Sequence, residues 1–306
     1  RAHQQIHRVW QITLACFALT TCIAISLGLG AAHIFETGKG LSLASLQSYA
    51  ATVDSSQLTP SEFLQTLVKN VFMNPFNALA QGNILAIVMF ALFVGIALAI
   101  KGQEYPQLQK LFNESFNLCM QLVGWIMQLA PLGIMALLFK LVLTENSALL
   151  GTLAQFIALV MGTTLLHGIV ILPLVLWLFT RVSPLTFWRG ARPALITAFA
   201  TSSSAATLPI TLNCLQQDLK VSPKVSGFVV PLGAQLNMDG TALYEAAAAL
   251  FVANLVGLDL SLGQELIICL TVMLASIGAP GIPSAGMVTM VMVLQSVGLP
   301  AEAIAI

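Results

Sequence analysis

The stretch GAQLNMDGTALYEA, residues 233–246, places an amide and two acids in the middle of an apolar segment. FVVPL precedes it and AAALFVANLVGL follows it, so both flanks are typical of a membrane helix. A charged side chain at the centre of a bilayer costs about 2.5–3.5 kcal/mol on insertion scales. Asn237, Asp239 and Glu245 are therefore expected to serve a function that offsets this cost.

The composition of the whole chain indicates an integral membrane protein. Of 306 residues, 58% are hydrophobic and only 8% are charged, whereas a soluble domain carries about 25% charged residues. The formal net charge of zero gives no indication of a nucleic acid or an acidic partner. The five cysteines form no metal-binding spacing and are expected to be buried free thiols. The absence of an initiator methionine suggests a fragment of a longer protein.

Long runs without charged side chains are expected to cross the membrane, because about 20 apolar residues span it as a helix. Arg1 and Arg8 place the N-terminus in the cytoplasm, since basic residues favour that side. The following helices then alternate in direction, with the loop 36–62 outside and a break expected at Asn74-Pro75. They are 9–35, 63–100, 112–142 and 147–180.

Two further stretches are too polar or too interrupted to cross simply: TAFATSSSAATLPITLN, residues 197–213, and ASIGAPGIPSAG, residues 275–286. Arg192 and Lys220 place both ends of the first stretch inside, and acidic residues place both ends of the second outside. Each is therefore expected to enter the membrane and turn back. Re-entrant hairpins of opposite orientation around an intervening helix indicate a transporter or a channel; the alternative for the second stretch is a kinked helix.

Within 233–246, Thr241 and Glu245 lie one helical turn apart on the same face. If the backbone unwinds at Asn-Met-Asp-Gly, which Gly240 would permit, Asn237 and Asp239 can converge with freed carbonyl oxygens. Oxygen-only ligands suit a hard cation such as sodium. The alternative is that both acids simply pair with neighbouring polar groups.

The serine run at the expected tip of the first hairpin offers hydroxyls and backbone N–H groups at a helix N-terminus. Such a terminus favours an anionic group, for example a carboxylate; the alternative is small residues for close helix packing. A nucleophilic serine would need a base, and nothing in the sequence fixes His167 near the serines. His167 is therefore expected to be a packed, hydrogen-bonded histidine, and Thr20-Thr21 alone would indicate helix packing.

Three motifs in this order, TSSSAATLP (201–209), GAQLNMDGTALYEA and SIGAPGIPSAG (276–286), resemble the dicarboxylate/amino acid:cation symporter family. That family includes the archaeal aspartate transporters and the excitatory amino acid transporters. The resemblance implies an all-α multi-pass membrane protein that works as an elevator-type homotrimer, here without the family's first two helices and its eighth. It implies a transport-domain helix 1–35, an extracellular loop 36–62, scaffold helices 63–145 and a transport domain 146–306. Within the last, it implies a helix 147–180, a re-entrant hairpin 186–216, a broken helix 222–257 and a re-entrant hairpin 262–298.

The resemblance also implies roles for individual residues. Substrate-contacting positions match Ser202, Ser203, Ser204, Thr241, Ile282 and Gly286. Sodium positions match Thr20, Thr21, Gly233, Gln235, Asn237, Met238, Asp239, Ser276, Ile277 and Ala279. Glu245 matches the excitatory type, in which this acid carries a proton. Gln235 stands where the family usually has threonine, and Ala279-Pro280 stiffens the tip of the second hairpin, which is expected to be the extracellular gate.

The residues and the resemblance together predict a symporter of the plasma (cell inner) membrane, not an enzyme, with no organic cofactor. It would import glutamate, aspartate or C4-dicarboxylates with co-transported sodium and protons. A sodium-dependent transporter of neutral amino acids, of the alanine/serine/cysteine type, is the alternative, since the eighth helix that decides the substrate is absent. An anion channel would instead pass current without sodium.

Overall fold

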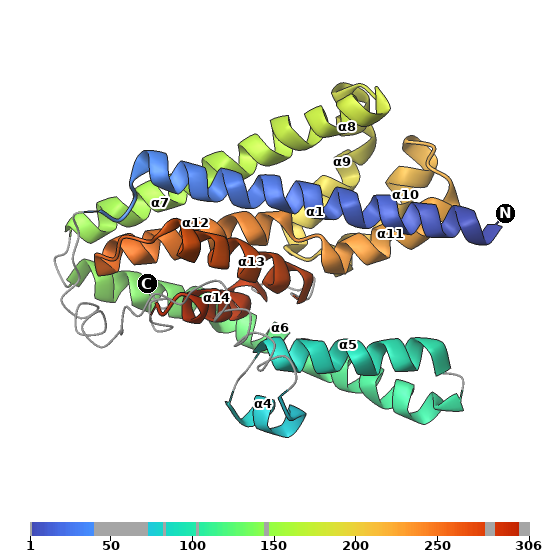
Figure 1. The fold of residues 1–306 in the computed structure, drawn as a ribbon, viewed down its shortest axis with the longest axis horizontal. Coiled ribbons are helices and arrows are strands. Elements are labelled where there is room, and N and C mark those ends of the chain that lie inside the picture. The colour runs from blue at the N-terminus through green and yellow to red at the C-terminus, as the bar shows by residue number, and fades with distance from the viewer. Residues whose placement is uncertain are drawn as a thin grey trace. The chain divides into compact units, whose positions relative to one another are not determined.

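The computed structural model describes residues 2–39, 73–81, 84–101, 104–143, 147–278 and 285–299. Every regular element in these ranges is a helix (Figure 1), so the predicted all-α class is confirmed. The contacts divide the chain into two compact units, Val68–Ala154 and the combination of Arg1–Leu67 with Gln155–Ile306. The assignment of a mobile transport domain and a static scaffold stays a prediction.

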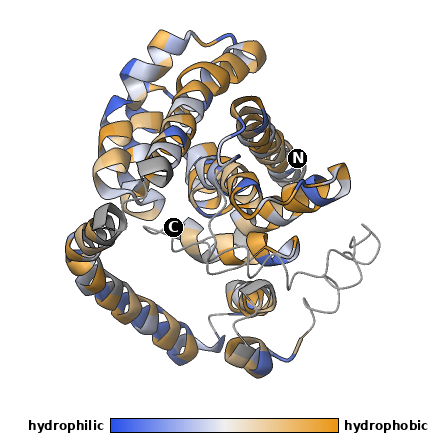
Figure 2. Cartoon of the chain, turned by 90° about the vertical axis from the view of Figure 1, so that its left-hand side faces the viewer, coloured by the Kyte–Doolittle hydropathy of each residue, from blue (hydrophilic) through white to orange (hydrophobic). Residues whose placement is uncertain are grey.

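The unit Val68–Ala154 contains α4 (Pro75–Gln81), α5 (Ile84–Lys101) and α6 (Pro106–Leu143). The break predicted at Asn74-Pro75 coincides with the start of α4, where the Asn74 side chain accepts a hydrogen bond from the Phe76 N–H at 2.9 Å. Proline suits this first helical position because its missing N–H would be unpaired there anyway. Large apolar side chains such as Phe93 and Trp125 are exposed on α5 and α6, and apolar residues predominate along most helices (Figure 2).

Among the residues that the structure describes, two segments are long and apolar enough to cross a membrane by length and composition, Val9–Phe35 and Leu150–Thr180. The first lies in α1 (Ala2–Phe35). The second runs through α7 (Ser147–Leu166), a π-helical turn (His167–Ile171) and α8 (Leu172–Thr180) without a break. Both helices were predicted from the sequence, and both are present.

The core of the larger unit is α12 (Asp239–Val256), of which 14 residues are buried. The alanine side chains at residues 246–249 are small, so neighbouring helices can approach closely. Helices α1, α13 (Leu262–Gly278) and α14 (Ala285–Ser296) pack against it. The closest approach is at Gly28 of α1, where an added Cβ would lie 2.5 Å from the Leu243 carbonyl oxygen. Only glycine fits at that position.

Two pairs of packed helices stand where the two hairpins were predicted. The first joins α9 (Pro184–Thr201) to α10 (Ser204–Asn213), and the chain reverses at Ser202, which has a left-handed φ of 49°. The second joins α13 to α14, and its tip, residues 279–284, lies outside the described residues. Their re-entry into a membrane stays a prediction.

The predicted helix break is confirmed, but it is shorter than expected and has another cause. It separates α11 (Pro223–Leu236) from α12 at Asn237 and Met238 alone, whose φ angles are −119° and −105°. Gly240 lies inside α12 and has no positive φ, so its conformational freedom is not what allows the break. Asp239 instead is the first residue of α12, where the positive end of the helix dipole stabilises its negative charge.

The expectation that all five cysteines are buried was wrong. Cys214 is buried and Cys269 half-buried, whereas Cys16, Cys22 and Cys119 are exposed free thiols. They lie on the outer faces of apolar helices, where an apolar surrounding makes exposure inexpensive.

Candidate cation-binding site

Two close helix contacts bring α1 to the break between α11 and α12. On one side of Thr20 and Thr21, Gly28 packs on the backbone of Leu243. On the other side, the ring of Phe17 packs on Gly233, where an added Cβ would lie 3.1 Å from the ring. The two threonines are therefore held facing the non-helical residues of the break.

Four side-chain oxygens from three segments converge there. The Thr21 hydroxyl donates to Asp239 Oδ1 at 2.8 Å. Asn237 Oδ1 lies 3.3 Å from the Thr20 hydroxyl oxygen and 3.4 Å from that of Thr21. Thr20 also lies 3.2 Å from the Phe17 carbonyl oxygen.

The two hydroxyl hydrogens in this cluster cannot serve all the acceptors around them. Thr21 has one hydrogen, and the shortest contact assigns it to Asp239, which leaves Asn237 Oδ1 facing a lone pair of Thr21. Oxygens bind a hard cation such as calcium at about 2.3–2.6 Å, so neighbouring ligands of an octahedral site lie roughly 3.3–3.7 Å apart. The distances from Asn237 Oδ1 to the two hydroxyl oxygens fit this range, so the cluster can hold a hard cation.

The carboxylate of the cluster, that of Asp239, is buried. Its side chain is only 8% exposed. Its Oδ2 lies 3.4 Å from His167 Nε2. His167 is buried and hydrogen-bonded, as expected, but its partner Asp239 was not foreseen.

Glu245 has a different environment on the same helix. It is fully buried, and the hydroxyl of Thr289 on α14 donates to its Oε1. Its Oε2 has no hydrogen-bond partner among the described residues. Thr289 also lies 3.2 Å from the Gly286 carbonyl oxygen, so the same hydroxyl lies between the buried acid and the backbone of the second hairpin.

The predicted substrate residues are only partly brought together. Thr241 packs against Gly286, where an added Cβ would lie 3.0 Å from the Thr241 methyl group. At the first hairpin, the Ser203 hydroxyl accepts from the Ala206 N–H at 3.2 Å and so caps α10. Ser204 lies at a cavity that it shares with Asn237. Ser202 is exposed at the turn, and Ile282 lies outside the described residues.

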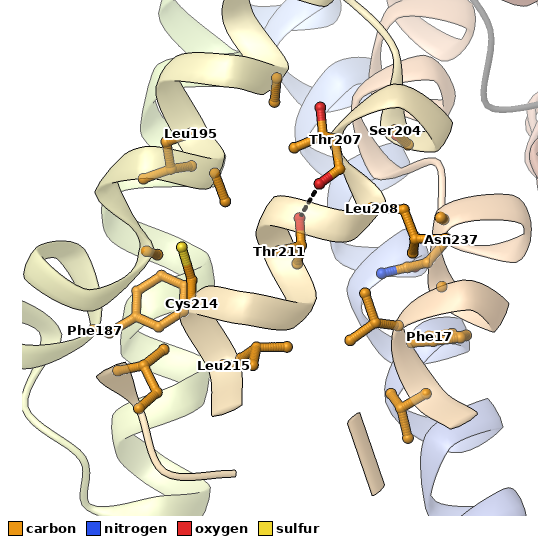
Figure 3. Close-up of a pocket in the computed structure, with 18 residues that line it drawn as sticks. Phe17, Phe187, Leu195, Ser204, Thr207, Leu208, Thr211, Cys214, Leu215 and Asn237 are labelled. Carbon is orange, nitrogen blue, oxygen red and sulfur yellow. Dashed lines mark hydrogen bonds between the residues drawn. The ribbon is translucent and has the colours of Figure 1, made fainter. Parts of the chain in front are cut away.

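The shared cavity has a volume of about 400 Å³ and lies between α9, α10 and α11 (Figure 3). Its walls are mostly apolar, and Phe17, Phe187 and Leu215 contribute to them. Polar groups enter from α10, where the Thr211 hydroxyl donates to the Thr207 carbonyl oxygen at 3.2 Å, and from Asn237. The cavity and the oxygen cluster therefore share Asn237.

The remaining predicted sodium residues that the structure describes lie on α11, at the helix break and on α13. The carbonyl of Gly233 accepts the N–H of Asn237 at 3.0 Å, and the Ser276 hydroxyl donates to the Met273 carbonyl at 2.9 Å. Gln235 is exposed and Met238 half-buried. The side chain of Ile277 and all of Ala279 lie outside the described residues, so this second sodium site stays a prediction.

Comparison with known proteins identifies the family of the chain. The model of the sodium:dicarboxylate symporter family matches residues 1–306. Mouse excitatory amino acid transporter 1 is 44% identical over 246 residues, which cover 79% of this chain and 45% of the relative. Human excitatory amino acid transporter 3 is 43% identical over 72% of this chain and 42% of its own length.

A putative sodium-dependent excitatory amino acid transporter, glt-4 of Caenorhabditis elegans, is 42% identical over 71% of this chain and 44% of its own length. The chain thus spans less than half the length of these relatives. The family model, in contrast, covers all of its residues. The chain belongs to the sodium:dicarboxylate symporter family.

Proposed function

We propose that the protein is a sodium-coupled symporter that imports acidic amino acids or C4-dicarboxylates, and not an enzyme. The observation that carries the proposal is the cluster of Thr20, Thr21, Asn237 and Asp239 at a helix break. The family supports the coupling to sodium. The names of the relatives, excitatory amino acid transporters, favour glutamate and aspartate as substrates.

In this mechanism sodium binds the oxygen cluster as a co-transported ion. Asp239 supplies the negative charge, and Asn237 and the two threonines supply neutral oxygens, so that the ion exchanges its hydration shell for protein ligands. Because α11, α12 and α1 all contribute, the bound ion holds the break in one arrangement. Substrate would then bind near Thr241 and Gly286, whose contact lies next to the break.

Glu245 is proposed to carry a proton in the same cycle. Its single hydrogen-bond donor is neutral, and no cation approaches it within the described residues. A change in its protonation would alter which group the Thr289 hydroxyl bonds, and Thr289 belongs to the second hairpin. The exchange of one proton would thereby affect the hairpin proposed as the gate.

The family resemblance also supports a homotrimer that moves its transport domain as an elevator. The exposed apolar faces of α5 and α6 are compatible with burial by lipid or by neighbouring protomers. The membrane proposed is the plasma (cell inner) membrane.

The test is uptake by the full-length protein reconstituted in vesicles. Labelled aspartate, glutamate, succinate and serine are offered with an inward gradient of sodium or of choline. Uptake of one of the three acids in sodium and not in choline is expected. Uptake of serine alone would establish the neutral amino acid alternative, and uptake that is equal in choline would overturn the sodium proposal. An ohmic current without sodium would indicate a channel.

A further inference from the structure

We propose that His167 is a positioning residue for the cation site, which holds the Asp239 carboxylate through its Nε2–H without neutralising its charge. The inference rests on the proposed sodium site. It assigns a role in that site to the segment α7–α8, which contributes none of the proposed ligands of the oxygen cluster.

The backbone at His167 is locally specialised. The π-helical turn His167–Ile171 begins at this residue and is followed by Leu172, whose N–H bonds the His167 carbonyl oxygen. Pro173 comes next, and it has no N–H to offer to the preceding turn. A π-helical turn holds one residue more than an α-helical turn, so the residues before and after it are rotated relative to the register of an uninterrupted helix. Such π-helical turns are frequent at functional sites.

The ring of His167 is 4% exposed, and its Nε2 lies 3.4 Å from Asp239 Oδ2. An ionised carboxylate only accepts hydrogen bonds, so the ring must carry its proton on Nε2 to interact favourably. Nδ1 is then the acceptor nitrogen, and it is buried with no partner among the described residues. The opposite tautomer would bury an unpaired N–H and set two acceptors against each other, which is the costlier arrangement.

The two carboxylate oxygens of Asp239 are thereby held by two different residues. Thr21 donates to Oδ1 at 2.8 Å and His167 faces Oδ2. A carboxylate with both oxygens held keeps one orientation, which is how residues behind a metal's direct ligands raise affinity. A lysine or arginine in this place would also orient the carboxylate, but it would compete with the cation for its charge. An imidazole N–H orients the ligand without adding a permanent positive charge.

A pair of variants separates this role from simple packing. His167→Gln keeps an N–H donor and loses the ring, whereas His167→Phe keeps the ring and loses the donor. The sodium concentration for half-maximal uptake should rise roughly 10–100-fold in His167→Phe, with the substrate KM at saturating sodium within about twofold of the parent. His167→Gln should restore most of the sodium affinity. The same order should appear in the thermal stabilisation by sodium, which reports ion binding without transport.

If His167→Phe binds sodium like the parent, or if His167→Gln is the more damaged of the two, His167 is a packing residue and the inference is overturned. Because His167→Phe could fail to fold, the tautomer provides an independent measurement. In the ¹⁵N spectrum of histidine-labelled protein, assigned by its loss in His167→Gln, the proton is expected on Nε2; a proton on Nδ1 would contradict the inference. Loss of sodium dependence in Asp239→Asn with normal affinity in His167→Phe would reject this inference alone, and sodium dependence kept in Asp239→Asn would reject the proposed site itself.

Discussion

Asp239 and Glu245 are two buried acids on one helix, and their surroundings differ in kind. Asp239 accepts a hydrogen bond from the Thr21 hydroxyl of α1 and faces the imidazole of His167 at the π-helical turn, and the Asn237 amide oxygen lies beside the same hydroxyl. Glu245 has one hydroxyl partner, on α14, and its other oxygen has none among the described residues. A site rich in oxygens suits an ionised acid with a metal ion, whereas a site with one neutral donor can hold an acid in either protonation state.

The largest effect is expected for the acid in the oxygen cluster. Asp239→Asn removes the only negative charge of the proposed sodium site while keeping nearly the same shape. Changes behind a metal's direct ligands already cost about 10–100-fold in affinity, so sodium-dependent uptake should fall at least about 100-fold. This fall is measured as uptake into vesicles at a series of sodium concentrations. If the sodium concentration for half-maximal uptake is unchanged in Asp239→Asn, the two acids do not differ as described.

The contact that joins both sites should come next in effect. Gly28→Val would place a side chain against the Leu243 backbone, between the cluster and Glu245. Overpacking of this kind typically costs about 1–3 kcal/mol, which for a protein of this size lowers the Tm by roughly 2–12 °C. Sodium dependence and pH dependence should weaken together.

Gly30→Val is the matched control for that variant, because an added Cβ there meets nothing within 4 Å. Its Tm in detergent should stay within about 2 °C of the parent. Equal losses in the two variants would mean that the close helix crossing does not hold the sites together.

A more selective effect is expected for the acid beside the single hydroxyl. Glu245→Gln mimics the neutral acid, so binding and exchange of substrate across vesicles should stay within about threefold of the parent. Acceleration of uptake by an inward pH gradient should disappear, while the half-saturating sodium concentration should not change. Full pH dependence in Glu245→Gln would exclude Glu245 as the proton carrier.

The smallest effect is expected for an acid outside the membrane segment. The Lys39 ammonium, 2.7 Å from Glu36, lowers the pKa of that exposed carboxyl below its usual value. Since a lowered pKa keeps the carboxylate ionised until the pH falls through it, Glu36 stays charged at neutral pH. Glu36→Gln should therefore leave the pH profile of uptake unchanged, which makes it a control for Glu245→Gln. A shifted profile would mean that pH acts elsewhere than at Glu245.

The sequence predicted the all-α class, the two long apolar helices and the helix break near Asn237, because each depends on local composition and spacing. It did not predict Thr289 or the partner of His167. His167 lies 72 residues from Asp239 in the chain, and a single histidine or threonine in an apolar run has no spacing that names its partner. The cause assigned to the helix break was also wrong, since Gly240 next to Asp239 suggested a flexibility that the helix does not use. The threonines of α1 were identified as ligands only through the family resemblance.

The crossing of α1 over α12 also affects how the protein is assembled. Thr20 and Asn237 are 217 residues apart, so at a synthesis rate of about 5–20 residues per second α1 precedes its partner by roughly 10–45 s. During that interval α1 must stay in the bilayer through its own apolarity, and it is one of the two segments apolar enough to do so. Helix α12 carries two acids and is not among these segments. It would therefore insert next to α1, which already offers Gly28 for a close contact and the hydroxyls of two threonines. The order of the helices along the gene thus lets the polar helix arrive when its partner is already in the membrane.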